Sequence, residues 1–257
     1  TFKGGKHVDY ITKQIITGII EYVKKRYKTD INPSYVKNYM KIFIDSIIEN
    51  PSFDSQTKER LITPASKFGS KCVIDDKMIK KIIDGTDIVD KSLSFAEFKL
   101  NKEAKKTNGA KVNKLRNIPK LDDANLAGTK KSQDCTLILT EGDSAKTMAI
   151  SGLSVIGRDN YGVFPLKGKI LNVKDATKKQ IMGNTELTNI KKIMGLVEGK
   201  IYKDTKSLRY GHIMILTDQD HDGSHIKGLL INLFHTLWPS LLQIPDFIIC
   251  MITPIVK

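Results

Sequence analysis

The chain has 257 residues, of which 40% are hydrophobic, a composition typical of a globular protein with room for more than one core. No apolar stretch approaches the ~20 residues that a membrane-spanning helix needs, so we expect no membrane partner. The three cysteines, Cys72, Cys135 and Cys250, are far apart and odd in number. They argue against a disulfide framework and a zinc cluster, and they favour a reducing compartment.

The formal net charge is +14, and half of this excess lies in one stretch. Residues 99–131 contain ten Lys and Arg against three acids, a net charge of +7. Such a concentration favours contact with a polyanion, although a lysine-rich linker in water has the same composition. A second basic run, Lys24, Lys25 and Arg26, ends a predicted helix, where it fits either the helix dipole or a phosphate.

The first half of the chain is predicted to be mainly helical. Apolar residues recur at helical spacing in residues 7–27, and shorter helices are expected at 75–84 and 95–106. The apolar residues 36–48 fit a helix or a strand equally. Residues 53–58 form a polar loop that ends in a lysine, and residues 121–131 are small and polar, as in a connection.

The second half contains two copies of one arrangement, in which a buried-type strand runs into acidic residues and then a helix. The first strand, 136–139, leads to Glu141, and its helix is predicted to begin at Asp143 or Ser144. The second, 212–216, leads to the sequence TDQDHDGSH, with Ser224 as the expected N-cap of the next helix. In a parallel sheet the carboxyl ends of the strands share one edge, so we expect the two acidic groups to meet there.

Three aspartates, Asp218, Asp220 and Asp222, alternate after the second strand. Alternate residues of an extended segment point the same way, so their carboxylates are expected to converge. Converging carboxylates repel one another unless a cation joins them. Oxygen ligands favour a hard cation, Mg²⁺ or Ca²⁺.

Other interpretations of these residues fit less well. An EF-hand loop needs a glutamate where the chain has Leu229, and a helix where it has a strand. Zinc would need a third ligand beside His221 and His225, and a solvated acidic turn does not explain three aspartates in register. A hydrolase with Ser144 as nucleophile would lack the G-x-S-x-G motif.

Three motifs in order, EGDSAK at 141–146, PLKGKILNV at 165–173 and TDQDHDGSHIKGLLINLFH at 217–235, resemble the Toprim domain of type IIA DNA topoisomerases. Four further stretches are similar to the eukaryotic topoisomerase II branch rather than to bacterial gyrase: LRYGHIMILTDQD, WPSLL, TFKGGKHVDY and NPSFDSQTKE. The resemblance covers essentially the whole chain.

The resemblance implies an α/β fold. A Rossmann-like Toprim domain, with a mostly parallel sheet flanked by helices, would follow the α+β C-terminal part of a transducer domain. The implied boundaries are 1–97 for the transducer part, 98–134 for a basic connector and 135–257 for Toprim.

The resemblance also implies roles for individual residues. Glu141 would be a metal ligand and general acid/base, and Asp218, Asp220 and Asp222 would bind Mg²⁺, with Mn²⁺ or Ca²⁺ able to substitute. His221 departs from the Gln of some eukaryotic members, at a position between the metal-binding acids. The remaining implied residues are DNA-binding (Lys24, Lys25, Arg26, Lys169 and Asn172) or reach the γ-phosphate of ATP (Gln56, Thr57 and Lys58).

The implied parent is a nuclear or viral homodimeric enzyme, localised to the nucleus, or to the host cell if viral. It would use ATP and pass one DNA duplex through a transient break in another. In the family, the nucleophilic tyrosine and the ATP-binding core lie outside the region that this chain resembles, so we expect an inactive fragment. Another Toprim nuclease or primase, or a non-catalytic basic nucleic-acid-binding module, remains the alternative.

Overall fold

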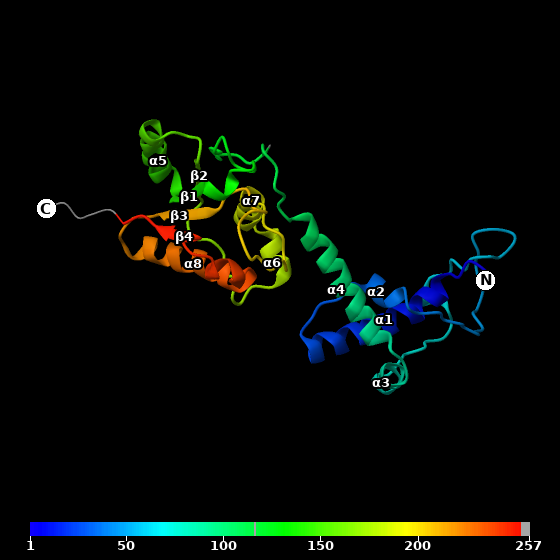
Figure 1. Cartoon of the computed structure of the whole chain (residues 1–257). Helices are drawn as coiled ribbons and strands as arrows, with labels where there is room; N and C mark the ends of the chain where they lie inside the picture. The colour runs from blue at the N-terminus through cyan, green and yellow to red at the C-terminus, as the bar shows by residue number, and fades with distance from the viewer. Residues whose placement is uncertain (116, 253–257) are drawn as a thin grey trace. The chain divides into compact units, whose positions relative to one another are not determined.

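The structure is a computed structural model that describes residues 1–115 and 117–252. Two compact units, Thr1–Lys99 and Leu100–Lys257, each have an interior of their own (Figure 1). No described helix is both long and apolar enough to cross a membrane. The predicted three-part division at 97 and 134 remains a prediction.

Unit 1 is built on helices. The predicted helix at 7–27 is confirmed as α1 (Lys6–Tyr27), and the one at 75–84 as α3 (Asp76–Gly85), which Asp75 caps by accepting a hydrogen bond from the Met78 N–H. The short α2 (Pro33–Lys37), the 3₁₀ turn η1 (Ala65–Lys67) and the start of α4 (Ile88–Lys106) complete its helices. Apolar residues of α1, α2, α3 and α4 share one core, which includes Ile19, Val23, Val36, Ile79, Ile83 and Ile88.

Of residues 36–48, which fit a helix or a strand equally, Val36 and Lys37 end α2, whereas the segment 41–49 forms neither structure. This segment follows α2 as irregular, extended chain, and no backbone hydrogen bond joins it to any other part of the chain that the structure describes. Phe43 and Ile47 are 94% and 95% exposed. A strand needs a neighbour for its N–H and C=O groups, and the described residues of unit 1 form only isolated bridges at Phe53, Gly5 and Leu61.

A folded loop follows this extended segment. Backbone hydrogen bonds from Asp54 N–H to Arg60 and from Ile62 N–H to Ser52 close its base. The Gly5–Leu61 bridge fastens the loop to the start of α1. A Cβ on Gly5 would lie 2.5 Å from the Leu61 carbonyl oxygen, so this close approach requires glycine.

Unit 2 contains a parallel four-stranded sheet in the order β2-β1-β3-β4. The strands are β1 (Thr136–Glu141), β2 (Tyr161–Leu166), β3 (His212–Leu216) and β4 (Ile248–Cys250). The predicted strands at 136–139 and 212–216 are therefore confirmed. The glycine and two lysines of PLKGKILNV predict a loop, but its first residues, Pro165 and Leu166, are buried in the sheet as the end of β2.

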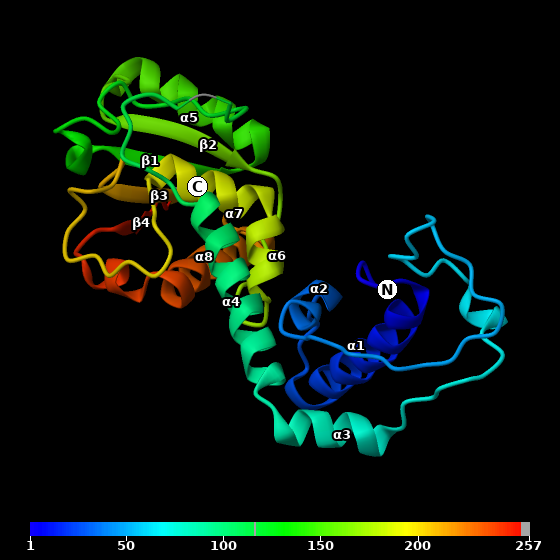
Figure 2. The same cartoon turned by 90° about the vertical axis from the view of Figure 1, so that its right-hand side faces the viewer.

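Helices cover both faces of the sheet, as Figures 1 and 2 show. On one face, α7 (Thr185–Met194) and α8 (His221–Leu237) pack on Leu137, Leu139 and Ile213 in the main core. On the other face, α5 (Gly142–Ile156) packs through Leu153 on Ile138 and Val163. The helix α6 (Lys178–Gly183) and the 3₁₀ turns η2 (Ser132–Asp134) and η3 (Pro239–Gln243) complete the unit.

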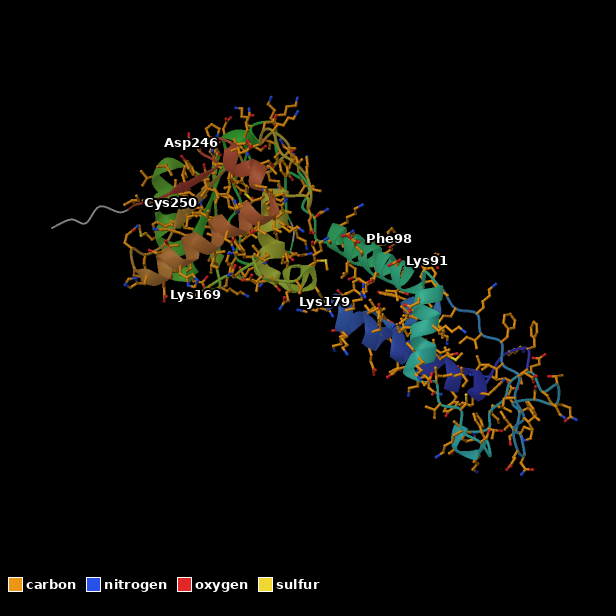
Figure 3. The ribbon with its side chains drawn as sticks, turned by 90° about the horizontal axis from the view of Figure 1, so that it is seen from below. Lys91, Phe98, Lys169, Lys179, Asp246 and Cys250 are labelled. Atoms are coloured by element: carbon orange, nitrogen blue, oxygen red, sulfur yellow. The ribbon has the colours of Figure 1, made fainter. Side chains whose placement is uncertain are left out.

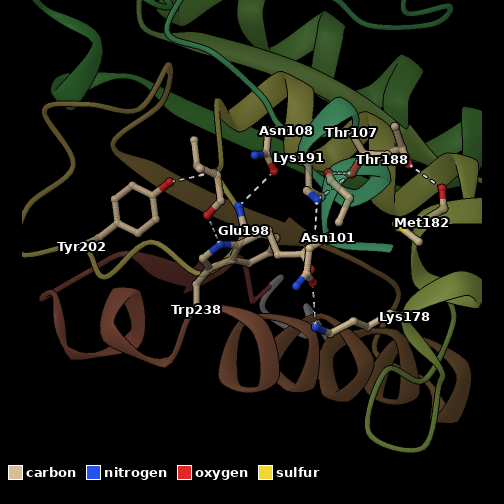
Figure 4. Close-up of polar contacts among 12 residues, drawn as sticks. Asn101, Thr107, Asn108, Lys178, Met182, Thr188, Lys191, Glu198, Tyr202 and Trp238 are labelled. Carbon is tan, nitrogen blue, oxygen red and sulfur yellow. Dashed lines mark hydrogen bonds and ion pairs between the residues drawn. The ribbon is translucent and has the colours of Figure 1, made fainter. Parts of the chain in front are cut away.

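The basic connector is fastened to unit 2 and is not a free linker. The helix α4 begins at Ile88, seven residues before the predicted start, and its end meets α7: Lys191 Nζ lies 2.8 Å from Thr107 Oγ1 and 3.1 Å from Glu198 Oε2 (Figure 4). Further on, the buried Arg209 donates to the Val112 carbonyl and pairs with Asp123 at 2.5 Å. These contacts explain why most of residues 98–134 belong to the second unit.

The three cysteines are free thiols in different environments. Cys72 and Cys250 are exposed, the latter at the end of β4 in Figure 3, and Cys135 is buried. Burial raises the pKa of the Cys135 thiol to about 11, so at pH 8 it is protonated and shielded. We expect a thiol reagent at pH 8 to modify two cysteines of the native chain within minutes and the third only in denaturant, as mass spectrometry would count. Rapid modification of Cys135 would contradict this packing.

Candidate metal and phosphate site at the carboxyl edge of the sheet

The two acidic groups lie at the ends of neighbouring strands. Glu141 is the last residue of β1, and Thr140 pairs with Leu216, the last residue of β3. Asp218 follows two residues after Leu216, so the two acids leave adjacent parallel strands at the same edge. Neighbouring strands are roughly 4.8 Å apart. The structure thus brings the two predicted tips together, as a parallel sheet requires.

Asp220 begins α8. Its carboxylate accepts a hydrogen bond of 2.7 Å from the Gly223 N–H, which makes Asp220 the N-cap. The prediction of Ser224 as the cap was therefore wrong, because an aspartate three residues upstream of a free N–H caps equally well. A Cβ on Gly223 would lie 2.1 Å from the Asp218 carbonyl oxygen, so glycine permits this tight turn from strand to helix.

Asp222 lies in the first turn of α8 and not in an extended segment. The expected alternation of three carboxylates on one side therefore ends at Asp220. Instead, Asp222 pairs with Lys169 at 2.9 Å. The hydrogen bond from Lys169 lowers the pKa of the Asp222 carboxyl, which therefore stays ionised to lower pH than an isolated aspartate.

The loop after β2 reaches α8. Lys169 makes the ion pair with Asp222, and Asn172 accepts a hydrogen bond of 2.8 Å from the Asn232 side chain. Because β2 is separated from β3 by β1 in the sheet, this loop crosses the carboxyl edge beside Glu141. All three sequence motifs therefore meet at this edge, and the exposed Lys167 and Lys169 bring positive charge to it.

Glu141 has an unsatisfied carboxylate oxygen. Its Oε2 is buried and has no hydrogen-bond partner among the described residues. A buried acceptor without a partner is costly unless a donor or a cation serves it. This oxygen therefore fits a site for a cation.

The acids are not gathered into a protein cage. Within residues 1–115 and 117–252, no three His, Cys, Asp or Glu side chains lie close enough together to hold a metal ion. Asp220 caps α8 by accepting a hydrogen bond from the Gly223 N–H, and Asp222 pairs with Lys169. Mg²⁺ is commonly held by one or two carboxylates together with water and substrate phosphates. Glu141 and Asp218 fit that description, and the metal roles of all four acids remain predictions.

The predicted ATP-contacting residues lie on the loop of unit 1. Gln56, Thr57 and Lys58 are all exposed, and the Lys58 ammonium lies 5.9 Å from the centre of the Phe53 ring. Lys58 has a φ of 54°, in the left-handed region that non-glycine residues rarely adopt. This tight turn presents the three side chains to solvent, and their role remains a prediction.

The predicted DNA-facing run ends α1. Lys24, Lys25 and Arg26 are exposed in the last turn, and Lys24 pairs with Asp30 at 3.3 Å. The run stabilises the helix end electrostatically. It leaves Lys25 and Arg26 available to a phosphate, so the structure accommodates both interpretations without choosing between them.

The sequence alone did not single out the residues that hold the first turns of α5, the helix that follows Glu141. Asp122 and Lys120 belong to the connector, and Lys146 ends the EGDSAK motif. Lys146 pairs with Asp122 and Lys120 pairs with Asp143, and each pair joins residues more than twenty positions apart, so no local spacing indicates them. The only signal was the presence of Lys146 in the motif.

The fold and the site identify the class of protein to which this chain belongs. Residues 136–249 match the family model of the Toprim domain, and residues 1–108 match that of DNA gyrase B. The chain therefore joins a gyrase-B-like segment to a Toprim domain, as the sequence motifs indicated.

Individual relatives narrow this class. The chain is 56% identical over 258 residues to DNA topoisomerase 2 of Pisum sativum, covering 100% of this chain and 18% of that protein. It is 57% identical over 263 residues to DNA topoisomerase 2-alpha of Gallus gallus, covering 100% and 17%. A crystal structure of the Plasmodium falciparum topoisomerase II DNA-binding, cleavage and re-ligation domain matches with a TM-score of 0.55 and 61% identity, over 56% of this chain and 20% of that one. The chain belongs to the eukaryotic DNA topoisomerase 2 family and spans less than a fifth of the length of these two curated relatives.

Proposed function

We propose that this chain is the part of an ATP-dependent type II DNA topoisomerase that holds the magnesium ions for DNA cleavage and religation. The proposal rests on the carboxyl edge of the sheet. There Glu141, whose Oε2 has no partner among the described residues, ends β1, and Asp218 follows the neighbouring strand β3. A basic loop crosses the same edge through the Lys169–Asp222 ion pair. Carboxylates for a cation and lysines for a phosphate are the groups that phosphoryl-transfer chemistry requires.

The roles of the chain's own residues follow from their places. Glu141, Asp218 and the carboxylate oxygen of Asp220 that does not cap α8 would hold Mg²⁺, which stabilises the charge that develops on the phosphate and the leaving oxygen. Glu141 would also hold or release a proton beside that oxygen. Lys169 and Asn172, on the exposed loop, would orient the DNA backbone beside them.

The rest of the proposal concerns the parent enzyme. Gln56, Thr57 and Lys58 would reach the γ-phosphate of ATP, and Lys24, Lys25 and Arg26 would face duplex DNA. The parent would act as a homodimer in the nucleus, or in the host cell if viral. The support for these roles is the identity of 56% or 57% along the whole chain to proteins named DNA topoisomerase 2.

A cation titration tests the site in this chain. We expect Mn²⁺, a paramagnetic substitute for Mg²⁺, to bind the wild-type chain, and Asp218→Asn with Asp220→Asn to weaken binding at least tenfold, as electron paramagnetic resonance of free Mn²⁺ would measure. The exposed Asp159, changed to Asn, is the control and should bind as wild type. Equal binding by all three would disprove the site. No binding by any, together with salt-sensitive DNA binding, would favour the non-catalytic module.

A further inference from the structure

The connector lies against the outer edge of the sheet, next to the helix that follows Glu141. Asp122 and Val163 exchange two backbone hydrogen bonds of 2.9 and 2.7 Å, which adds the connector to the free edge of β2 in antiparallel fashion. Two residues later, the Ala124 N–H donates to the buried Tyr210 hydroxyl at 2.9 Å. Residues 122–124 of the connector are therefore held in a fixed position against β2 and Tyr210.

From this fixed position the connector forms ion pairs with the first turns of α5. Lys146 Nζ lies 2.6 Å from Asp122 Oδ2 and donates to the Lys120 carbonyl oxygen at 2.8 Å. Only 16% of the Lys146 side chain is exposed, so this ion pair is partly shielded from water. A second pair joins Lys120 to Asp143 at 2.5 Å, and it is more exposed and contributes less.

Glu141 directly precedes the turns of α5 that these ion pairs hold. It is both the last residue of β1 and the N-cap of α5, and its side chain makes no cap hydrogen bond. Its backbone is held by the sheet on one side and by the first turn of α5 on the other. Gly142, the first residue of α5, has a φ of 77°, in the left-handed region. The direction of the Glu141 carboxylate therefore depends on where α5 begins.

We infer that Lys146, braced by Asp122 of the connector, is a positioning residue that aims the Glu141 carboxylate into the cation site. This inference rests on the proposed function of that site. Lys146 contacts Asp122 and the Lys120 carbonyl, and no reacting atom. It acts by fixing the helix turn, so its loss should weaken cation binding and leave DNA binding unchanged.

The test uses the full-length parent enzyme and cleavage of supercoiled plasmid over a range of Mg²⁺ concentrations. For Lys146→Ala, we expect the Mg²⁺ concentration for half-maximal cleavage to rise at least fivefold, with DNA affinity within twofold of wild type. Lys146→Arg should rescue most of the effect. The swap of Lys146→Asp with Asp122→Lys should recover part of it, whereas either single reversal should be worse than alanine. Lys203→Ala is the control, because Lys203 is exposed and none of the ion pairs found within residues 1–115 and 117–252 includes it.

The outcomes separate the inference from the function on which it rests. If Glu141→Gln abolishes cleavage but folded Lys146→Ala keeps the wild-type Mg²⁺ dependence, the inference fails and the site stands. If Glu141→Gln cleaves normally, the site itself fails. A lower melting temperature for Lys146→Ala, with DNA affinity and cleavage falling together at every Mg²⁺ concentration and no rescue by the swap, would show a merely structural role and overturn the inference.

Discussion

Glu141→Gln in the full-length parent enzyme is expected to reduce DNA cleavage by about 10²-fold or more, the range of a lost general acid or base, while DNA binding stays within about twofold. The substitution keeps the shape of the side chain and removes its charge. The buried Oε2, which has no partner among the described residues, then loses its attraction for a cation. DNA affinity depends on many lysine–phosphate contacts, which this change does not touch.

The measurement is a plasmid-cleavage assay beside a gel-shift titration at fixed salt. Glu103→Gln is the matched control, since Glu103 is an exposed glutamate of α4 and should cleave as wild type. A Glu141→Gln enzyme that cleaves normally in Mg²⁺ would show that the assignment of Glu141 is wrong. Loss of binding and cleavage together would place the residue in DNA contact instead.

Asp123→Ala is expected to lower the free energy of unfolding of unit 2 by about 3 kcal/mol. Asp123 accepts from the fully buried Arg209 at 2.5 Å and from the Tyr210 hydroxyl at 2.5 Å. Without Asp123, the buried guanidinium of Arg209 would keep the backbone carbonyls of Val112 and Ile193 as its partners among the described residues. Asp123 is itself one-quarter exposed, which places the cost at the low end of the range for broken buried pairs.

Urea unfolding followed by tryptophan fluorescence measures this effect. Trp238 is the sole tryptophan and is 1% exposed in the core of unit 2, so its signal reports that unit alone. The exposed Asp159, changed to Ala, is expected to alter stability by less than about 0.5 kcal/mol. An Asp123→Ala chain as stable as wild type would mean that the buried ion pair contributes nothing net. Replacing Arg209 with Met as well should restore part of the loss, since no buried charge then remains.

Periodicity predicted the long helices and the two acid-tipped strands because each has a strong local signal. The helix α1 has an apolar face along its whole length, and β1 and β3 are short buried runs next to charged residues. The parallel arrangement could also be anticipated, since strand, acid and helix occur twice. The boundaries at Ser224 and at the start of α4 were missed, because more than one residue in each region can begin a helix.

The contacts that orient the site lay beyond sequence reasoning. The Lys169–Asp222 pair and the Lys146–Asp122 pair join segments that are distant in the chain, and many lysines could have served either aspartate. The strand β2 has only a weak local signal, since Gly162 and Pro165 are poor strand formers, and burial in the sheet overrides that preference. Residues 36–48 have an apolar pattern that fits a helix or a strand equally. In the structure Val36 and Lys37 end α2, and residues 41–48 have no backbone hydrogen-bond partner in the described chain.

That extended segment has a practical consequence. Residues 41–49 present backbone donors and acceptors that have no partner in the described part of the chain, together with the exposed Phe43 and Ile47. An unprotected edge of this kind is a template on which a second molecule can add a strand, and it is the usual starting point of aggregation. Preparations of this chain by itself should therefore lose solubility as concentration rises, and a lysine at position 43 should delay the onset.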